Sequence, residues 1–161
     1  MKNKIKYLTK EQCIRQGFVK TDNGYYKMTV LEKYLAKGWL DLGNTKYSEN
    51  DRMRAARRFQ KDYEQSCFMT AKISSYRERV DSCGKNIEDI EAICKARASY
   101  AQALKQVPKE FLEAVYQVCI NNKDFESAQA VSERRKLELS FSFKRDVCRG
   151  LDYLIKFYWS K

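Results

Sequence analysis

Hydrophobic residues recur at helical spacing over the last forty residues of the chain. Between residues 140 and 159, the apolar positions that follow this three-to-four-residue spacing are Val147, Leu151, Leu154, Ile155 and Tyr158. The polar residues that fall roughly opposite to them are Ser142, Arg145, Arg149 and Lys156. The pattern predicts an amphipathic helix with a basic outer side.

Two further helices are expected just before this one. Residues 109–120 follow Pro108, which is favoured at the start of a helix, and residues 124–136 form the next helical stretch. Leu137, Glu138 and Leu139 are expected to form a three-residue turn between the last two helices. Helix, short turn, helix, turn and helix is the order of a trihelical helix-turn-helix DNA-binding unit, although any small helical bundle also needs amphipathic helices.

The pattern also predicts elements upstream of this unit. Helices are expected over residues 29–37, 49–66 and 86–106, with Ser48 capping the second of them. The Asn23-Gly24 step predicts a β-hairpin with strands over residues 18–20 and 25–28. A short helix is expected from Leu8, and residues 68–85 have no clear period and are expected to form a mobile basic loop.

These elements define an all-α fold class. We expect a helical bundle with a carboxy-terminal helix-turn-helix unit and a small amino-terminal β-hairpin. Residues 1–45 are interpreted as a helix and hairpin appendage, and residues 46–161 as the helical domain.

The net charge of the chain favours one class of binding partner. The 161-residue chain holds 32 basic and 21 acidic residues, a formal charge of +11, which favours a polyanion and nucleic acid first. A simply solvated basic surface is the alternative. On the helix of residues 49–66, the same two interpretations apply to Arg54, Arg58 and Lys61, either as a solvated side or as a second set of phosphate contacts.

Composition argues against a membrane protein, a metal site and an enzyme. No run reaches the roughly 18–20 apolar residues of a membrane span, so a cytoplasmic location is expected. The six cysteines include no C-x-x-C pair and the chain has no histidine, so neither a metal site nor a cofactor is expected. Cys94, Cys119 and Cys148 are expected on apolar helix sides. Catalytic sequence motifs are absent, and no enzymatic activity is expected.

The candidate site residues lie on the last helix and just before it. Base contacts are assigned to Ser142, Arg145 and Arg149, and phosphate contacts to Arg134, Arg135, Lys136 and Lys144. The expected function is DNA binding in transcriptional regulation, with double-stranded DNA as the partner. One alternative is a module that docks onto RNA polymerase or another regulator through Phe141, Phe143 and Trp159. Another is a phage-type DNA-packaging accessory protein.

Several segments carry a family resemblance. They are residues 30–35 (VLEKYL), Tyr47, residues 55–64 (AARRFQKDYE), residues 87–92 (IEDIEA), residues 116–119 (YQVC) and residues 154–158 (LIKFY). In order and type they resemble an uncharacterised helix-turn-helix domain of alphaproteobacteria, which also forms the carboxy-terminal part of the gene transfer agent activator. In outline the part of the chain from Pro108 onward also looks like the promoter-reading end of a bacterial sigma factor. The resemblance implies DNA binding or transcriptional regulation. In the activator, this region is associated with transcription and with contact to RNA polymerase, which is in line with the docking alternative.

Overall fold

The described part of the chain is an all-α helical bundle with one small hairpin. The computed structural model describes residues 18–21, 24–43, 46–76, 86–125 and 132–159. Along these ranges the elements are β1 (Phe18–Thr21), β2 (Gly24–Lys27), α2 (Val30–Ala36), α3 (Glu49–Tyr76), α4 (Asn86–Gln106), α5 (Lys109–Cys119) and α6 (Glu133–Trp159). The predicted all-α fold class is therefore confirmed. The hairpin is antiparallel and pairs Phe18 with Lys27 and Thr21 with Gly24.

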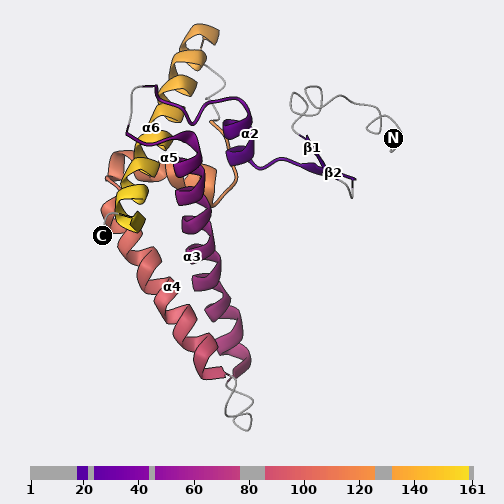
Figure 1. Ribbon diagram of the computed structural model, residues 1–161, viewed down its shortest axis with the longest axis vertical. Coiled ribbons are helices and arrows are strands. Elements are labelled where there is room, and N and C mark those ends of the chain that lie inside the picture. The colour runs from indigo at the N-terminus through magenta and orange to yellow at the C-terminus, as the bar shows by residue number, and fades with distance from the viewer. Residues whose placement is uncertain (1–17, 22–23, 44–45, 77–85, 126–131, 160–161) are drawn as a thin grey trace.

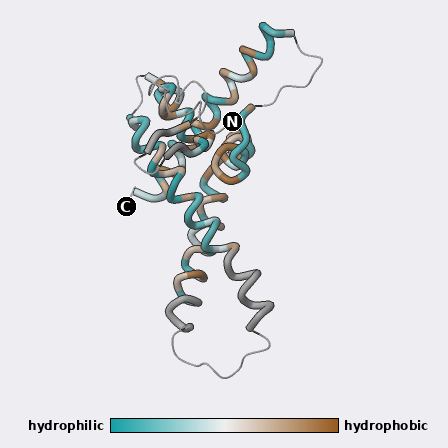
Figure 2. Tube along the Cα trace, turned by 90° about the vertical axis from the view of Figure 1, so that its right-hand side faces the viewer, coloured by the Kyte–Doolittle hydropathy of each residue, from teal (hydrophilic) through white to brown (hydrophobic). Residues whose placement is uncertain are grey.

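The helices form a head and an arm. Figure 1 shows α3 and α4 side by side and antiparallel, extending together away from the other helices. At the other end of this pair, α2, α5 and α6 gather around the first half of α3 to form the head. The amino-terminal part of α6 extends beyond the head on the side opposite to the arm, as both Figure 1 and Figure 2 show.

Local hydrogen bonds explain where α2 and α3 begin. Thr29 Oγ1 accepts from the amide of Glu32 and the Glu32 carboxylate accepts from the amide of Thr29, which is a complete capping box for α2. Ser48 and Asp51 make the same reciprocal pair at the start of α3. These bonds satisfy amides that the helices themselves leave without a partner.

A second contact ties the start of α2 to the segment after α5. Asn122 has a φ of 52°, a left-handed conformation that asparagine tolerates better than most residues. Its side-chain oxygen accepts a 2.7 Å hydrogen bond from the amide of Val30. Nearby, the Tyr34 hydroxyl donates to Asp124 over 2.5 Å. Two residues that follow α5 therefore hold α2 against the head.

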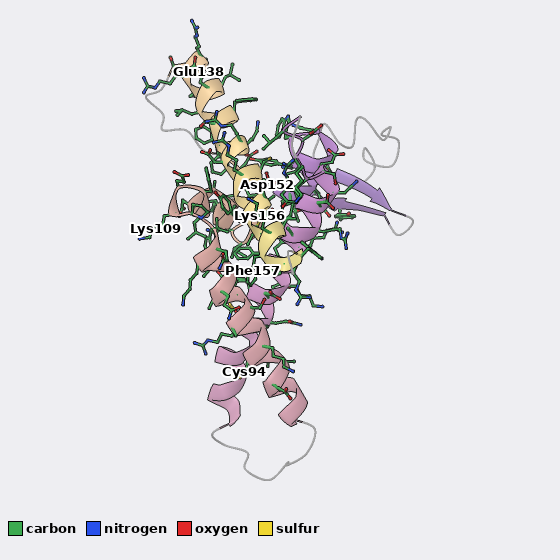
Figure 3. All side chains as sticks on the ribbon, turned by 60° about the vertical axis from the view of Figure 1, so that its left-hand side comes forward. Cys94, Lys109, Glu138, Asp152, Lys156 and Phe157 are labelled. Atoms are coloured by element: carbon green, nitrogen blue, oxygen red, sulfur yellow. The ribbon has the colours of Figure 1, made fainter. Side chains whose placement is uncertain are left out.

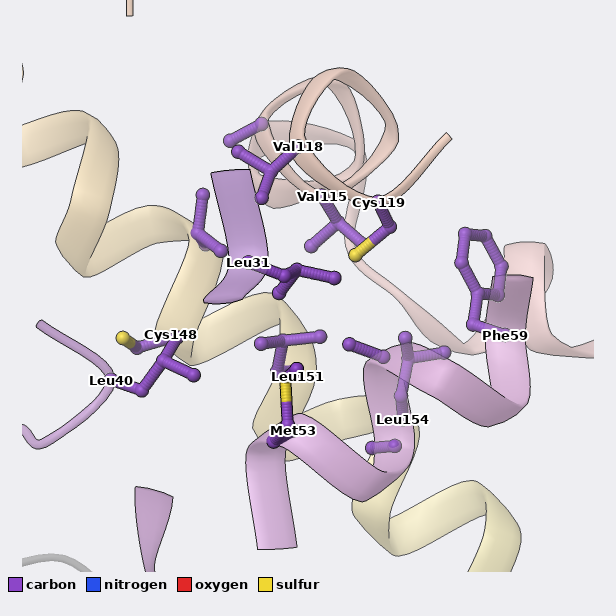
Figure 4. Close-up of a cluster of buried hydrophobic side chains, with 14 of the residues drawn as sticks. Leu31, Leu40, Met53, Phe59, Val115, Val118, Cys119, Cys148, Leu151 and Leu154 are labelled. Atoms are coloured by element: carbon purple, nitrogen blue, oxygen red, sulfur yellow. The ribbon is translucent and has the colours of Figure 1, made fainter. Parts of the chain in front are cut away.

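The head has one hydrophobic core to which every helix contributes. Figure 4 shows Leu31 of α2, Phe59 of α3, Val115 of α5 and both Leu151 and Leu154 of α6 within it. All five side chains are buried. Residues 30–40, which the sequence placed in the appendage, also supply core side chains, Val30, Leu31, Tyr34 and Leu40. Burial of this apolar surface is what holds the head together.

Of the side chains that the structure describes, two charged ones are buried among these apolar groups, and both are paired. Arg52 Nε donates to Asp152 over 2.7 Å, and Arg52 Nη1 donates to the carbonyl of Leu40 over 2.7 Å. Asp62 accepts from Ser99 over 2.6 Å and from the Tyr158 hydroxyl over 3.0 Å. Pairing is the condition under which a buried charge is tolerated, so these contacts fix α3 against α4 and α6.

The predicted turn at residues 137–139 is wrong. Leu137, Glu138 and Leu139 lie inside α6, which is one continuous helix of 27 residues. Leucine and glutamate are strong helix formers, and no glycine or proline interrupts the backbone here. The helix-turn-helix unit that depended on this turn is therefore not formed. Of the helix predicted over residues 124–136, residues 133–136 belong to α6 and residues 126–131 lie outside the described part.

The loop predicted over residues 68–85 is wrong for its first half. Residues 68–76 are the last turns of α3, which pairs with α4 along the arm. No glycine or proline occurs among them, so nothing in their sequence ends the helix. Residues 77–85 lie outside the described residues, as does the short helix expected from Leu8. No helix of the described residues has the length and apolar content needed to cross a membrane.

Candidate nucleic-acid interface

The outward side of α6 carries a row of polar and basic side chains. Arg135, Ser142, Arg145, Arg149 and Lys156 are spaced by seven, three, four and seven residues, which places them on one side of a helix. The residues of the opposite side, Val147, Leu151, Leu154 and Ile155, are buried in the head. Four of the five outward side chains are exposed and Ser142 is half-buried. We call these five residues the outward row.

The cations of the outward row have no carboxylate partner among the described residues. The ion pairs within that part of the chain leave out Arg135, Arg145, Arg149 and Lys156. The contact that Arg145 makes is a long one, 3.5 Å from Nη2 to Ser142 Oγ. Charges without internal partners remain available to an external anion.

The other predicted phosphate-contacting residues lie differently. Arg134 Nε is 3.6 Å from Glu138 Oε1, and Lys136 Nζ is 2.9 Å from Glu133 Oε1. Lys144 points to another side of α6, where its Nζ lies 3.4 Å from the centroid of the Trp39 ring. Burial lowers the pKa of Lys144, an effect that Asp124 opposes and Lys37 reinforces. Of the four residues assigned to phosphates, the structure places only Arg135 in the outward row.

Basic residues of α3 lie beside the carboxy-terminal end of α6. The guanidinium of Arg54 is 5.5 Å from the centroid of the Trp159 ring, and that of Arg58 is 6.0 Å from the Tyr158 ring. Arg58 also pairs with Asp62 over 3.3 Å. Arg57 is exposed on the same helix, and the sequence interpretation missed it. Its spacing of three and four residues from Arg54 and Lys61 is the signal that identifies it.

The three predicted docking residues do not form one site. Phe141 is 71% exposed on the overhanging part of α6. Phe143 is half-buried and its ring packs against Phe125, with centroids 5.8 Å apart. Trp159 is 18 residues beyond Phe141, about 27 Å along the helix axis. Leu137, one turn before Phe141, is 72% exposed and was not among the predicted docking residues.

Buried thiols in the head belong to the core. Burial raises the pKa of Cys119 to about 12 and that of Cys148 to about 11, so both thiols are protonated at neutral pH. The prediction that Cys94 lies on an apolar helix side is wrong, because this side chain is exposed. Among the residues that the structure describes, no three acidic, cysteine or histidine side chains gather into a possible metal site. The expected absence of a metal and of a cofactor stays a prediction.

Fold and surface together define a basic, all-α protein whose last helix presents, on its outward side, exposed cations that have no carboxylate partner in the described part of the chain. Comparison of the chain with models of protein families, with curated protein sequences and with solved structures finds no match in any of the three. The family resemblance given above therefore stays a prediction.

Proposed function

We propose that this protein binds double-stranded DNA through the outward row of α6. The observation that carries the proposal is the set of four exposed cations in that row that have no carboxylate partner among the described residues. Lysine and arginine that neutralise phosphates release condensed counterions, and this is the main source of affinity in sequence-independent DNA binding. The formal charge of +11 adds long-range attraction to a polyanion.

The dimensions of the row fit a single crossing of the duplex. Arg135 and Lys156 are 21 residues apart, or about 31 Å along a helix axis, which is close to the roughly 34 Å of one turn of B-DNA. A straight helix cannot follow a curved groove over that length. In this proposal Ser142, Arg145 and Arg149 at the centre face base edges, and Arg135 and Lys156 at the ends meet phosphates.

The biological setting in this proposal is transcriptional control. It comes from the sequence resemblance to a helix-turn-helix family, and the continuous α6 means that the contact would not have the standard helix-turn-helix geometry. Glu138 and Asp146 are acidic residues of α6 near the row, and both weaken the local positive field. Glu138 is held by Arg134, which offsets its effect in part.

Binding of labelled random-sequence duplex across a series of salt concentrations tests the proposal. Arg135→Ala combined with Lys156→Ala is expected to lower affinity and to reduce the slope of log K against log salt by about 1.8, because each lost phosphate contact contributes about 0.9. If only one of these two cations contacts a phosphate, the slope falls by about half of this.

Arg97→Ala is the matched control, because Arg97 is an exposed arginine on α4 in the arm. It is expected to leave both affinity and slope unchanged. Duplex binding that is unaffected by the double substitution, or reduced equally by the control, would overturn the proposal.

A further inference from the structure

A groove separates the overhanging part of α6 from the segment that joins α2 to α3. Its volume is about 460 Å³, within the range of pockets that hold small ligands or a few large side chains. Trp39 and Leu42 line one wall, and Leu137, Phe141 and Lys144 line the other. The lining of the groove therefore combines large apolar side chains with the cations of Lys144 and Arg145 and with one carboxylate, that of Asp41.

The apolar wall on α6 continues the side of the helix that forms the core. Leu137 and Phe141 precede the buried residue Cys148 by eleven and seven residues, spacings that keep all three on a related side. The head ends before it reaches them, and their exposures are 72% and 71%. Figure 3 shows Glu138 on this overhanging part, whereas Asp152 and Phe157 lie where α6 meets the other helices. Large apolar side chains left uncovered beside a groove are typical of an interaction site.

Positive charge surrounds this apolar surface. The ammonium groups of Lys37 and Lys144 lie 4.5 Å and 3.4 Å from the centroid of the Trp39 ring, and Arg145 also lines the groove. None of these three cations has an ion pair among the described residues.

The carboxylates nearby are already engaged by internal donors. Asp41 accepts a 2.8 Å hydrogen bond from the amide of Gly43. Asp124 accepts from the Tyr34 hydroxyl and from the amide of Phe125. The groove is left with cations that can pair with an incoming anion and with apolar side chains that can be covered.

We propose that this groove is a docking site for an acidic peptide segment of a partner protein, whose bulky apolar side chains cover Leu137 and Phe141 and whose carboxylates pair with Lys144 and Lys37. Apolar anchors seated in a groove and surrounded by charge pairs are a common mode of peptide recognition. The proposal does not depend on DNA binding.

Charge argues against two other occupants. A second copy of the chain would bring a further formal charge of +11 towards a positive surface. Residues 1–17 of the chain itself hold five basic residues and one acidic residue, which is the wrong sign for this groove.

Stacking of a nucleobase on Trp39 is disfavoured as well. Two ammonium groups lie against its ring, and the ring of Tyr34 meets it edge to face with centroids 5.5 Å apart. Base stacking needs an open aromatic face.

Fluorescence anisotropy with the full-length protein and designed labelled peptides tests the proposal. The probe is an amphipathic peptide of about 18 residues, or five helical turns, with leucine and phenylalanine at helical spacing and glutamate elsewhere. A second peptide has lysine in place of every glutamate, and a third has the acidic composition in scrambled order. The acidic probe is expected to bind, the lysine peptide is not, and the scrambled peptide is expected to bind at least tenfold more weakly.

Single substitutions then locate the binding. Phe141→Ala is expected to lower the affinity for the acidic probe about tenfold, because truncation of an aromatic side chain at the centre of an interface typically has an effect of this size. Lys144→Glu is expected to abolish binding of the acidic probe. Leu139→Ala is the matched control, since Leu139 is an exposed leucine on another side of the same helix, and it is expected to have no effect.

Other outcomes overturn the proposal. They are equal binding of the three peptides, equal effects of Phe141→Ala and Leu139→Ala, and a dimer in sedimentation that Phe141→Ala dissolves. Loss of duplex binding or of binding to phosphatidylserine vesicles on Phe141→Ala, with peptide binding unchanged, would also assign the groove to a different occupant.

Discussion

Arg52 of α3 and Asp152 of α6 form a two-point ion pair at the centre of the head. Arg52 Nε lies 2.7 Å from Asp152 Oδ1, and Nη2 lies 3.1 Å from Oδ2. Its remaining nitrogen, Nη1, donates to the carbonyl of Leu40. One side chain therefore joins α3, α6 and the segment before α3, and a planar guanidinium is the group whose geometry permits this.

Loss of Arg52 is expected to destabilise the protein strongly. Arg52→Ala leaves Asp152 without its cation and the Leu40 carbonyl without its donor, at a cost of about 3 kcal/mol. This is the lower end of the usual range for breaking a buried ion pair, because the Asp152 side chain keeps 20% exposure. Urea unfolding monitored by circular dichroism measures the change.

Two variants show whether the geometry or the charge of the Arg52 side chain provides this stability. Arg52→Lys keeps the charge but cannot make all three contacts, so it is expected to lose most of the same stability. Arg54→Ala, an exposed neighbour, is expected to change stability by less than about 0.5 kcal/mol. A lysine variant as stable as the parent protein would contradict the role assigned to the guanidinium.

Gly150 permits the close approach of α5 and α6. A Cβ at this position would overlap Val115 Cγ2 and would lie 3.3 Å from Phe111 Cβ. Gly150→Ala is therefore expected to destabilise the head by about 1–3 kcal/mol, although alanine is the better helix former. Thermal and urea unfolding measure this loss.

Combining Gly150→Ala with Val115→Ala tests the cause. Removing the valine methyls makes room for the new Cβ, so the double variant is expected to be more stable than the sum of the two single losses predicts. Strict additivity of the two changes would show that the contact with Val115 is not responsible.

The buried thiols give the stability a dependence on alkaline pH. Cys148 donates to the carbonyl of Trp39 over 3.3 Å, and burial raises its pKa from about 9 to about 11. Below pH 9 the thiol is protonated in both folded and unfolded states and contributes no pH dependence. As pH rises from 9 towards 11, the unfolded state loses the proton first, so stability is lost, by about 2 kcal/mol at pH 10.5.

Unfolding in urea at pH 7.5, 9 and 10.5 measures this effect. Cys148→Ala is expected to remove this part of the decline, while the raised pKa of Cys119 leaves another part of about the same size. The same decline in the alanine variant and in the parent protein would exclude Cys148 as its source.

The proposed placement of the outward row on DNA leads to a separate prediction about preference among DNA sequences. Arg145→Ala is expected to flatten the preference among duplex sequences, because a central arginine faces base edges in the proposed arrangement. Arg135→Ala is expected to weaken binding to all duplex sequences alike. It is also expected to lower the slope of log K against log salt by about 0.9, because one phosphate contact at the end of the row is lost. Binding selection from a random duplex library measures both, and the reverse pattern would contradict the placement.

Periodicity allowed much of the head to be predicted from the sequence. The carboxy-terminal stripe of Val147, Leu151 and Leu154 is buried as expected, and Ser48 caps α3 as its type indicates. These features depend on local spacing and on side chains near a helix end, which the sequence contains directly.

Features that depend on distant partners were not predictable in the same way. The turn predicted at Leu137 and Leu139 depends on the expected helix-turn-helix arrangement, whereas the helix propensity of the two leucines favours a continuous helix. Cys94 has an apolar side chain, but Ala96 and Ala103 are the buried residues among the α4 side chains that the structure describes. The groove beside Trp39 depends on how far α6 extends beyond the head, which no local pattern determines.

Because no turn interrupts α6, the orientation of its carboxy-terminal half about the helix axis fixes the orientation of its overhanging half. A single residue inserted between Lys144 and Val147 would rotate the overhanging half by about 100° relative to the head and carry Phe141 away from Trp39. Four inserted residues would bring the rotation back to within about 40° of the starting orientation. A flexible turn could accommodate insertions of any length. A continuous helix keeps the overhanging half near its original orientation only when an insertion adds about one whole helical turn.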